Sequence, residues 1–173
     1  RKPVWSWQTF SYKKKKDPAV YQAGEELLSK HSDSKYAKEV VADLGQIAIQ
    51  SGDYGRAAEY FEKFISLYPQ DPLSRKLIMS AAVLRENQGD YEKAIDYYRQ
   101  MNSPLEKVAL LMAKAKKWRE LNQYAMKSPD SLLRNYYVGL SLQRLGELSA
   151  AAPSFNKVIK STPANENEKT MVA

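Results

Sequence analysis

The stretch KEVVADLGQIAIQSGDYGRAAEYFEKFISLYPQD, residues 38–71, contains two helical patterns separated by a short turn. Apolar residues recur at steps of three and four, which places them on one face of a helix. In the first pattern these are Val41, Leu44, Ala48 and Ile49, and in the second Ala57, Ala58, Phe61, Phe64 and Ile65. Ser51-Gly52-Asp53 interrupts the first pattern, and Pro69 ends the second. Because so few residues join the two helices, we expect them to pack antiparallel as a hairpin.

Two small residues, Gly45 and Ala57, occur where these helices would cross, and they allow the backbones to approach closely. One such hairpin cannot bury its own apolar face, so it requires neighbouring hairpins of the same kind. Gly89-Asp90-Tyr91 repeats Gly52-Asp53-Tyr54 at a distance of 37 residues, and Lys116-Lys117-Trp118 stands at the corresponding place later. The helical region, residues 17–173, therefore divides into 17–37 (a partial unit), 38–71, 75–104, 105–127 (a degenerate unit), 131–163 and 164–173 (a truncated helix).

Individual residues mark the ends and faces of the predicted helices. Asp17-Pro18 indicates a helix start, and His31 suits a solvated C-terminal cap. Pro153 is expected in the first turn of the last second helix, where its missing N–H does no harm. Asn165 can cap the truncated helix. Tyr136-Tyr137 cannot share one helical face, so one of the two tyrosines should point away from the core.

The hairpins 38–71, 75–104 and 131–163 resemble tetratricopeptide repeats, which place small and large residues at set positions around a Gly or Asp turn. The resemblance implies an all-α fold, a right-handed α-solenoid of about three to four such hairpins with partial end units. It also implies a concave groove, lined by the first helices, that binds a segment of a partner protein within a larger assembly. The predicted groove residues are Gln46, Ile49, Met79, Val83, Glu86, Tyr136, Leu140 and Gln143.

Two finer expectations follow from the resemblance. One subgroup of the family clamps C-terminal carboxylates with Lys and Asn side chains on successive first helices. The matching positions hold Glu39, Ala42, Asp43, Met79, Ser80 and Tyr136, so this clamp is absent. The ending of the first hairpin, residues 64–69, resembles repeats of bacterial cell-envelope proteins. That likeness implies a location in the bacterial periplasm or cell envelope, with the cytoplasm as the alternative.

No pattern of residues indicates catalysis. The chain contains no cysteine and a single histidine, His31, which excludes disulfides, thiol nucleophiles and the common zinc sites. The turn glycines lack the GxxxxGK[ST] spacing of a phosphate-binding loop. No apolar stretch approaches the ~20 residues that a membrane-spanning helix needs. We therefore predict a protein that is not an enzyme and that uses no catalytic residue, cofactor or metal.

Residues 1–16, RKPVWSWQTFSYKKKK, form a basic-aromatic arm. The net charge of the chain is +7, and six of its positive charges lie in this arm without any acid, so the remainder is close to neutral. That distribution disfavours a nucleic-acid-binding body. The aromatic residues suit a cover over the open end of the array. Alternatively, the arm binds RNA or an anionic membrane surface through Lys13, Lys14, Lys15 and Lys16.

Two further alternatives concern the chain as a whole and its second basic cluster. The chain can be the docking domain of a larger enzyme, and its first residue, Arg1, indicates a piece of a longer protein. The second cluster consists of Lys107, Lys114, Lys116, Lys117 and Arg119. These residues either solvate a surface helix and turn or meet an acidic partner or anionic lipid.

Overall fold

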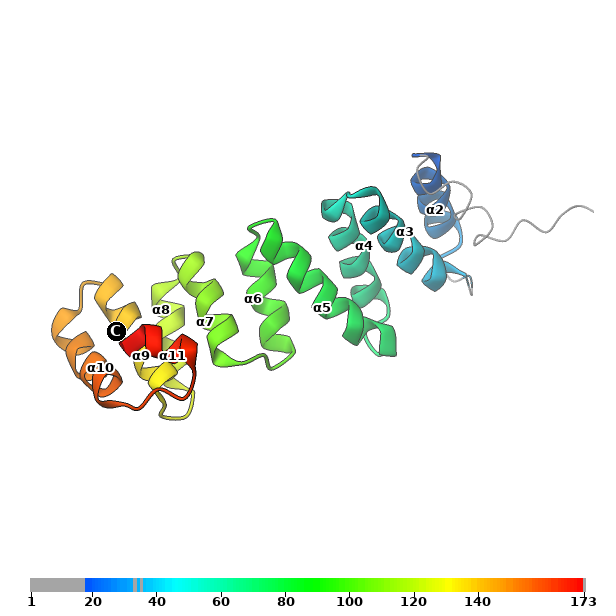
Figure 1. Cartoon of the computed structure of the whole chain (residues 1–173). Helices are drawn as coiled ribbons and strands as arrows, with labels where there is room; N and C mark the ends of the chain where they lie inside the picture. The colour runs from blue at the N-terminus through cyan, green and yellow to red at the C-terminus, as the bar shows by residue number, and fades with distance from the viewer. Residues whose placement is uncertain (1–17, 33, 35, 173) are drawn as a thin grey trace, which may run out of the picture. The chain divides into compact units, whose positions relative to one another are not determined.

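The structure, a computed structural model, describes residues 18–172 except 33 and 35, and within this part of the chain every regular element is a helix. The predicted arm, residues 1–16, and Asp17 lie outside the described residues. The helices are α2 (Ala19–Lys30), α3 (Ala37–Ser51), α4 (Tyr54–Leu67), α5 (Pro72–Asn87), α6 (Tyr91–Gln100), α7 (Leu105–Lys114), α8 (Trp118–Met126), α9 (Leu132–Arg144), α10 (Leu148–Lys160) and α11 (Glu166–Val172) (Figure 1). The all-α prediction is confirmed.

The chain forms two compact units, an N-terminal unit up to Asp90 and a C-terminal unit from Tyr91. In the N-terminal unit, α2 packs against α3, α3 against α4, and α4 against α5. In the C-terminal unit, the same succession runs from α6 through α10. Each unit therefore consists of helices that pack in chain order as hairpins, as predicted, which is consistent with a tetratricopeptide solenoid. The right-handed superhelix that the resemblance implies stays a prediction.

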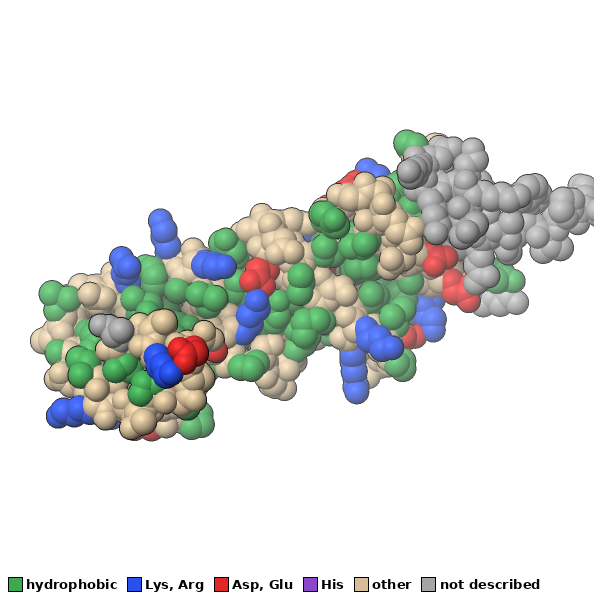
Figure 2. Space-filling view, viewed as in Figure 1, with side chains coloured by type: hydrophobic (Ala, Val, Ile, Leu, Met, Phe, Trp, Pro, Cys, Tyr) green, Lys and Arg blue, Asp and Glu red, His purple; other side chains and the backbone are tan. Residues whose placement is uncertain are grey.

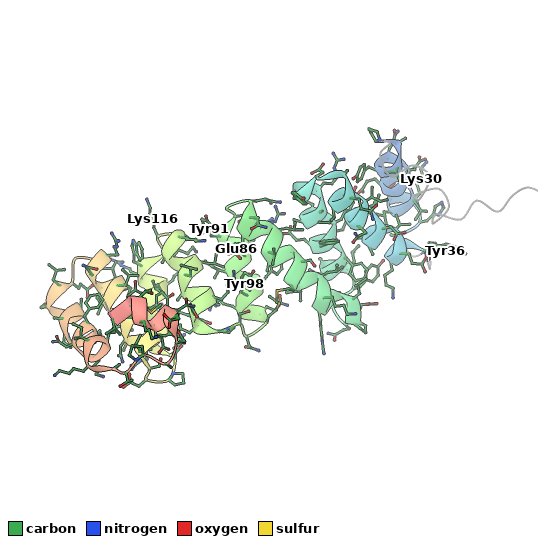
Figure 3. All side chains as sticks on the ribbon, viewed as in Figure 1. Lys30, Tyr36, Glu86, Tyr91, Tyr98 and Lys116 are labelled. Carbon is green, nitrogen blue, oxygen red and sulfur yellow. The ribbon has the colours of Figure 1, made fainter. Side chains whose placement is uncertain are left out.

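The turns between paired helices share one backbone feature, a residue in the left-handed conformation. Gly52, Gly89 and Gly146 have φ angles of 79°, 78° and 83°, and Lys116 has a φ angle of 57° at the turn between α7 and α8. Trp118 then begins α8 as Tyr54 begins α4. The prediction that Lys116-Lys117-Trp118 replaces a Gly-Asp-Tyr turn is confirmed, and the Lys116 side chain extends away from the helices (Figure 3).

Because a side chain makes the left-handed conformation unfavourable, Lys116→Gly is expected to stabilise the C-terminal unit by about 1 kcal/mol. Urea unfolding followed by circular dichroism measures this gain. The matched control is Lys114→Gly, which places glycine at the end of α7 and should destabilise the unit by roughly 0.5–1 kcal/mol. If both variants lose stability, the turn at Lys116 does not carry the expected strain.

Small residues lie on the first helices, seven positions before each left-handed residue. They are Gly45, Ala82, Ala109 and Gly139, and all four are buried. A Cβ atom on Gly45 would lie 2.6 Å from Cδ1 of Phe61, and one on Gly139 would lie 2.9 Å from Cε1 of Phe155. The predicted close approach at Gly45 is therefore confirmed, with the ring of Phe61 occupying the space that a side chain would need.

The predicted helix ends hold with one exception. His31 is exposed and caps the C-terminus of α2, and the Asn165 side chain accepts a hydrogen bond from the Glu168 backbone N–H at 2.9 Å to cap α11. The prediction for Pro153 is wrong, because it is the sixth residue of α10. The helix begins at Leu148, two residues after the left-handed Gly146, as α4 begins two residues after Gly52. The proline therefore lies beyond the first turn of α10, where it removes one N–H from the helical hydrogen bonds.

Candidate protein-binding surface

The left-handed turn residues give a common register for the first helices α3, α5, α7 and α9. Three positions on each first helix are counted back from its turn residue. Ten positions before the turn residue are Ala42, Met79, Glu106 and Tyr136, and six positions before it are Gln46, Val83, Leu110 and Leu140. Three positions before it are Ile49, Glu86, Ala113 and Gln143. None of these twelve residues is buried. The register therefore contains all eight predicted groove residues and places them on helix faces that the hairpin packing leaves accessible.

The face of the N-terminal unit combines apolar and polar side chains. On α5, Met79 and Val83 are 48% and 41% exposed. Glu86, three residues after Val83 on the same helix, is half-buried. On α3, Gln46 is exposed and Ile49 is half-buried. Hydrophobic side chains show at the surface over α5 in Figure 2. This face therefore offers aliphatic contacts to a ligand.

One ion pair fixes the two first helices of this face at their starts. The Lys38 ammonium nitrogen on α3 lies 2.7 Å from a carboxylate oxygen of Asp71, whose other oxygen accepts a hydrogen bond from Leu73 N–H and caps α5. Hydrogen bonding to Lys38 lowers the pKa of Asp71 below its usual range. Both α3 and α5 also pack on α4, so α4 and this ion pair connect the two first helices. The face is thus formed before any partner binds.

In the C-terminal unit, the corresponding face lies on α7 and α9, which contact each other. Leu110 on α7 is 43% exposed, and Tyr136 and Leu140 on α9 are half-buried. Gln143 is exposed at the end of α9. The short helix α11 contacts α9 (Figure 1). Its Asn167 amide donates a hydrogen bond to Glu106 of α7 at 3.2 Å. One end of this face therefore carries a segment of the chain itself.

The adjacent tyrosines on α9 behave as predicted. Tyr137 is buried, and burial raises the pKa of its hydroxyl to about 12. Tyr136 is only half-buried, and the two rings meet edge to face with their centroids 5.3 Å apart. Tyr137 thus belongs to the core, while Tyr136 contributes an aromatic surface to the accessible face.

Leu110 is a surface residue that the sequence prediction did not include. The turn of residues 105–127 was predicted at Lys116-Lys117-Trp118, but the first helix of this degenerate unit was not included in the predicted groove. Leu110 lies six positions before the left-handed Lys116, just as Val83 lies six positions before the left-handed Gly89. The signal was therefore present in the sequence, in the turn already assigned to Lys116-Lys117-Trp118.

The second basic cluster is largely engaged within the C-terminal unit. The Lys117 nitrogen lies 3.0 Å from a Glu92 carboxylate oxygen and 3.1 Å from one of Glu120. The ammonium groups of Lys107 and Lys114 lie over aromatic rings, 4.8 Å and 5.9 Å from the centroids of Tyr98 and Tyr91 respectively. These contacts favour a structural role for the cluster over an anionic ligand.

One cavity of the C-terminal unit lies apart from the first-helix register. A cavity of about 580 Å³ lies at the ends of helices in the C-terminal unit, lined by Arg99, Asn102, Ser103, Leu105, Tyr124, Ser128, Pro129, Ser131 and Leu133. No group of three or more His, Cys, Asp or Glu side chains that could hold a metal occurs among the residues the structure describes. Within the same residues, no helix has the length and apolar character to cross a membrane.

Comparison with known proteins supports the repeat assignment over part of the chain. The family model described as tetratricopeptide repeat matches residues 42–104, which confirms the resemblance for that stretch. No curated protein matches the chain. Among solved structures, MamA from Desulfovibrio magneticus RS-1, residues 41 to the end, is similar at 17% sequence identity with a TM-score of 0.45. That similarity covers 89% of this chain and 92% of the MamA chain.

Proposed function

We propose that this chain is a non-catalytic scaffold whose first-helix faces bind a segment of another protein within a multi-protein assembly. The observation that supports this most is the exposure of large apolar side chains on two first helices, with Val83 and Leu110 at the same register position and Met79 one turn before Val83. Single exposed apolar residues are normal on a protein surface. Their recurrence in one register of repeated hairpins, over faces formed by packed helices, is typical of a binding surface.

The composition of these faces indicates the kind of segment that fits. Aliphatic and aromatic side chains alternate there with Gln46, Glu86 and Gln143, and the Lys–Asn clamp for carboxylates is absent. A helix or extended peptide with two or three apolar anchors matches this surface better than a bare carboxylate does. Because hairpin packing already orders the receptor helices, binding does not have to order them, which favours affinity.

Met79→Glu and Leu140→Glu are each expected to weaken partner binding at least tenfold, because burying a carboxylate against an apolar segment requires its desolvation. The partner is first isolated from the native organism with the tagged chain, identified by mass spectrometry and then titrated by calorimetry. Met126→Glu on α8 is the matched control, since Met126 is similarly exposed on a second helix. Binding that survives both first-helix variants would place the site elsewhere.

A second candidate function uses the arm, residues 1–16. The observation that favours it is the concentration of the net positive charge there, including Lys13, Lys14, Lys15 and Lys16. Such a segment would act as an adaptor for RNA or anionic lipid, with affinity that falls as salt increases. Salt-dependent retention on RNA or anionic vesicles that is lost on deletion of residues 1–16 would support it.

We also propose a bacterial cell-envelope setting, supported by the likeness of residues 64–69 to repeats of envelope proteins. Fractionation of native cells with an antibody against the chain tests this location. Recovery with the cytoplasmic proteins would contradict it. The role as a docking domain of a larger enzyme stays an alternative, which the sequence of the complete gene would decide.

A further inference from the structure

We propose that a cavity in the C-terminal unit is a binding site for a small apolar carboxylate, separate from the first-helix faces. The cavity has a volume of about 580 Å³ and lies at the ends of α6 and α8 and the starts of α7 and α9. Cavities of this size bind small ligands in proteins. The described residues that line it include one cation, Arg99, and no acid.

A similar cavity in the N-terminal unit shows what distinguishes this one. That cavity, of about 560 Å³, is likewise lined by the ends of two second helices, α2 and α4, and by Ala37 at the start of α3. The charged residues that line it, among those described, are Glu25 and Lys63, whose side chains pair at 2.9 Å. Their charges cancel each other, whereas the lining of the C-terminal cavity offers no acid to its cation.

The guanidinium of Arg99 is available to a ligand. It lies over the ring of Tyr124, 5.6 Å from the centroid, and no carboxylate pairs with it within the described part of the chain. The ring orients the cation without cancelling its charge. Asp130 is close to the cavity in sequence, but its Oδ1 accepts hydrogen bonds from Arg134 and Asn135, both at 2.8 Å. A ligand carboxylate can therefore supply the missing negative charge.

The rest of the lining indicates which carboxylate fits. The side chains of Asn102, Ser103 and Ser128 make no hydrogen bond to other described residues, so their donors are open to a bound carboxylate. Leu105 and Leu133 provide apolar walls. One guanidinium matches the single charge of a carboxylate and can form two parallel hydrogen bonds with it, whereas a phosphate group carries more charge than one cation balances. The ligand should therefore join one carboxylate to an aliphatic or aromatic body.

The test titrates the isotope-labelled full chain with phenylbutyrate and with its neutral amide, phenylbutyramide, and follows backbone chemical shifts by NMR. Phenylbutyrate should bind with a dissociation constant of about 1 mM. Phenylbutyramide should bind about tenfold more weakly, because it cannot form the charge-assisted pair with Arg99. The shifts should change at Ser103 and Ser128 and stay constant at Ala37, which lines the N-terminal cavity.

Two substitutions test the role of charge in the cavity. Arg99→Met removes the cation and should weaken phenylbutyrate binding about tenfold. Asn102→Asp is nearly isosteric at a left-handed position, φ 51°, that Asp also tolerates. Its added carboxylate should weaken binding about fivefold, because it repels the ligand and neutralises Arg99. Arg119→Met on α8 is the matched control, since it removes the same charge from an exposed residue outside the cavity.

A third ligand separates the two sources of this chemistry, a free carboxylic acid and the C-terminal residue of a polypeptide. A tripeptide that ends in phenylalanine with a free carboxylate should bind more tightly than phenylbutyrate only if the natural ligand is a polypeptide end. Equal binding of phenylbutyrate and phenylbutyramide overturns the proposal. So does the absence of shifts at about 10 mM phenylbutyrate, or an affinity that Arg99→Met and Arg119→Met change equally. Met79→Glu and Leu140→Glu should leave the affinity unchanged, so the outcome is independent of the proposed function.

Discussion

Gly45→Ala is expected to destabilise the N-terminal unit by about 2 kcal/mol, although alanine is the better helix former. The added Cβ atom would lie 2.6 Å from Cδ1 of Phe61, well inside van der Waals contact. Phe61 is 4% exposed and cannot move without displacing its neighbours. Overpacking of this kind costs typically 1–3 kcal/mol, here about 3, which outweighs the ~1 kcal/mol that alanine gains over glycine in a helix. Hydrogen exchange of α3 and α4 measures the loss.

Gly139→Ala is the matched control for this prediction. The new Cβ atom would lie 2.9 Å from Cε1 of Phe155, but this ring is half-buried, so it can shift toward solvent. We expect a loss below about 1 kcal/mol, since the helix propensity of alanine offsets a smaller strain. Equal losses for the two substitutions would show that ring mobility does not control the response, and a gain in stability at Gly45 would contradict the close packing.

The helices follow from local signals in the sequence, and the core follows for the most part. Val41, Leu44 and Ala48 form the predicted stripe and are fully buried. Ile49 belongs to the same predicted stripe but is half-buried, while Ile47 is buried instead. Residues 48 and 49 are adjacent in sequence, so they cannot both lie at the centre of one stripe. Because α3 packs against both α2 and α4, it buries a wide arc, with Ile47 inside one edge of the arc and Ile49 at the other edge.

The candidate surface was predictable from the positions of the turns, provided that every repeat unit was included. Val83 lies six residues before a glycine turn and was assigned, whereas Leu110 lies six residues before Lys116 and was not. The exposed state of Ile159 could not be derived from the sequence either, because its counterpart Ile65 has the same residue type in the same register. Ile65 is half-buried on α4 whereas Ile159 is exposed on α10, so the exposure depends on how neighbouring helices pack and not on the residue itself.

The ion pair between α4 and α5 has no local signal at all, since Arg85 and Glu62 are 23 residues apart on different helices. Nε of Arg85 donates to Glu62 at 2.6 Å and Nη2 at 2.7 Å, which is a bidentate geometry. Nη1 donates to the Gln88 side chain at 3.0 Å. Hydrogen bonding to Glu62 raises the pKa of the Arg85 guanidinium above its usual range. The pair therefore holds the two charges in a fixed arrangement at the helix contact.

Arg85→Met is expected to destabilise the N-terminal unit by about 2–3 kcal/mol, because it leaves the Glu62 carboxylate at a helix contact without the guanidinium. The two side chains are 11% and 18% exposed, so the loss is smaller than for a fully buried pair. Replacing both partners, as Arg85→Met/Glu62→Met, should return stability to within about 1 kcal/mol of the native chain, since no charge then remains to be desolvated. Urea unfolding of the single and double variants provides the cycle. Additive losses would show that the pair contributes packing alone, whereas recovery in the double variant shows that the cost of the single change is an uncompensated charge.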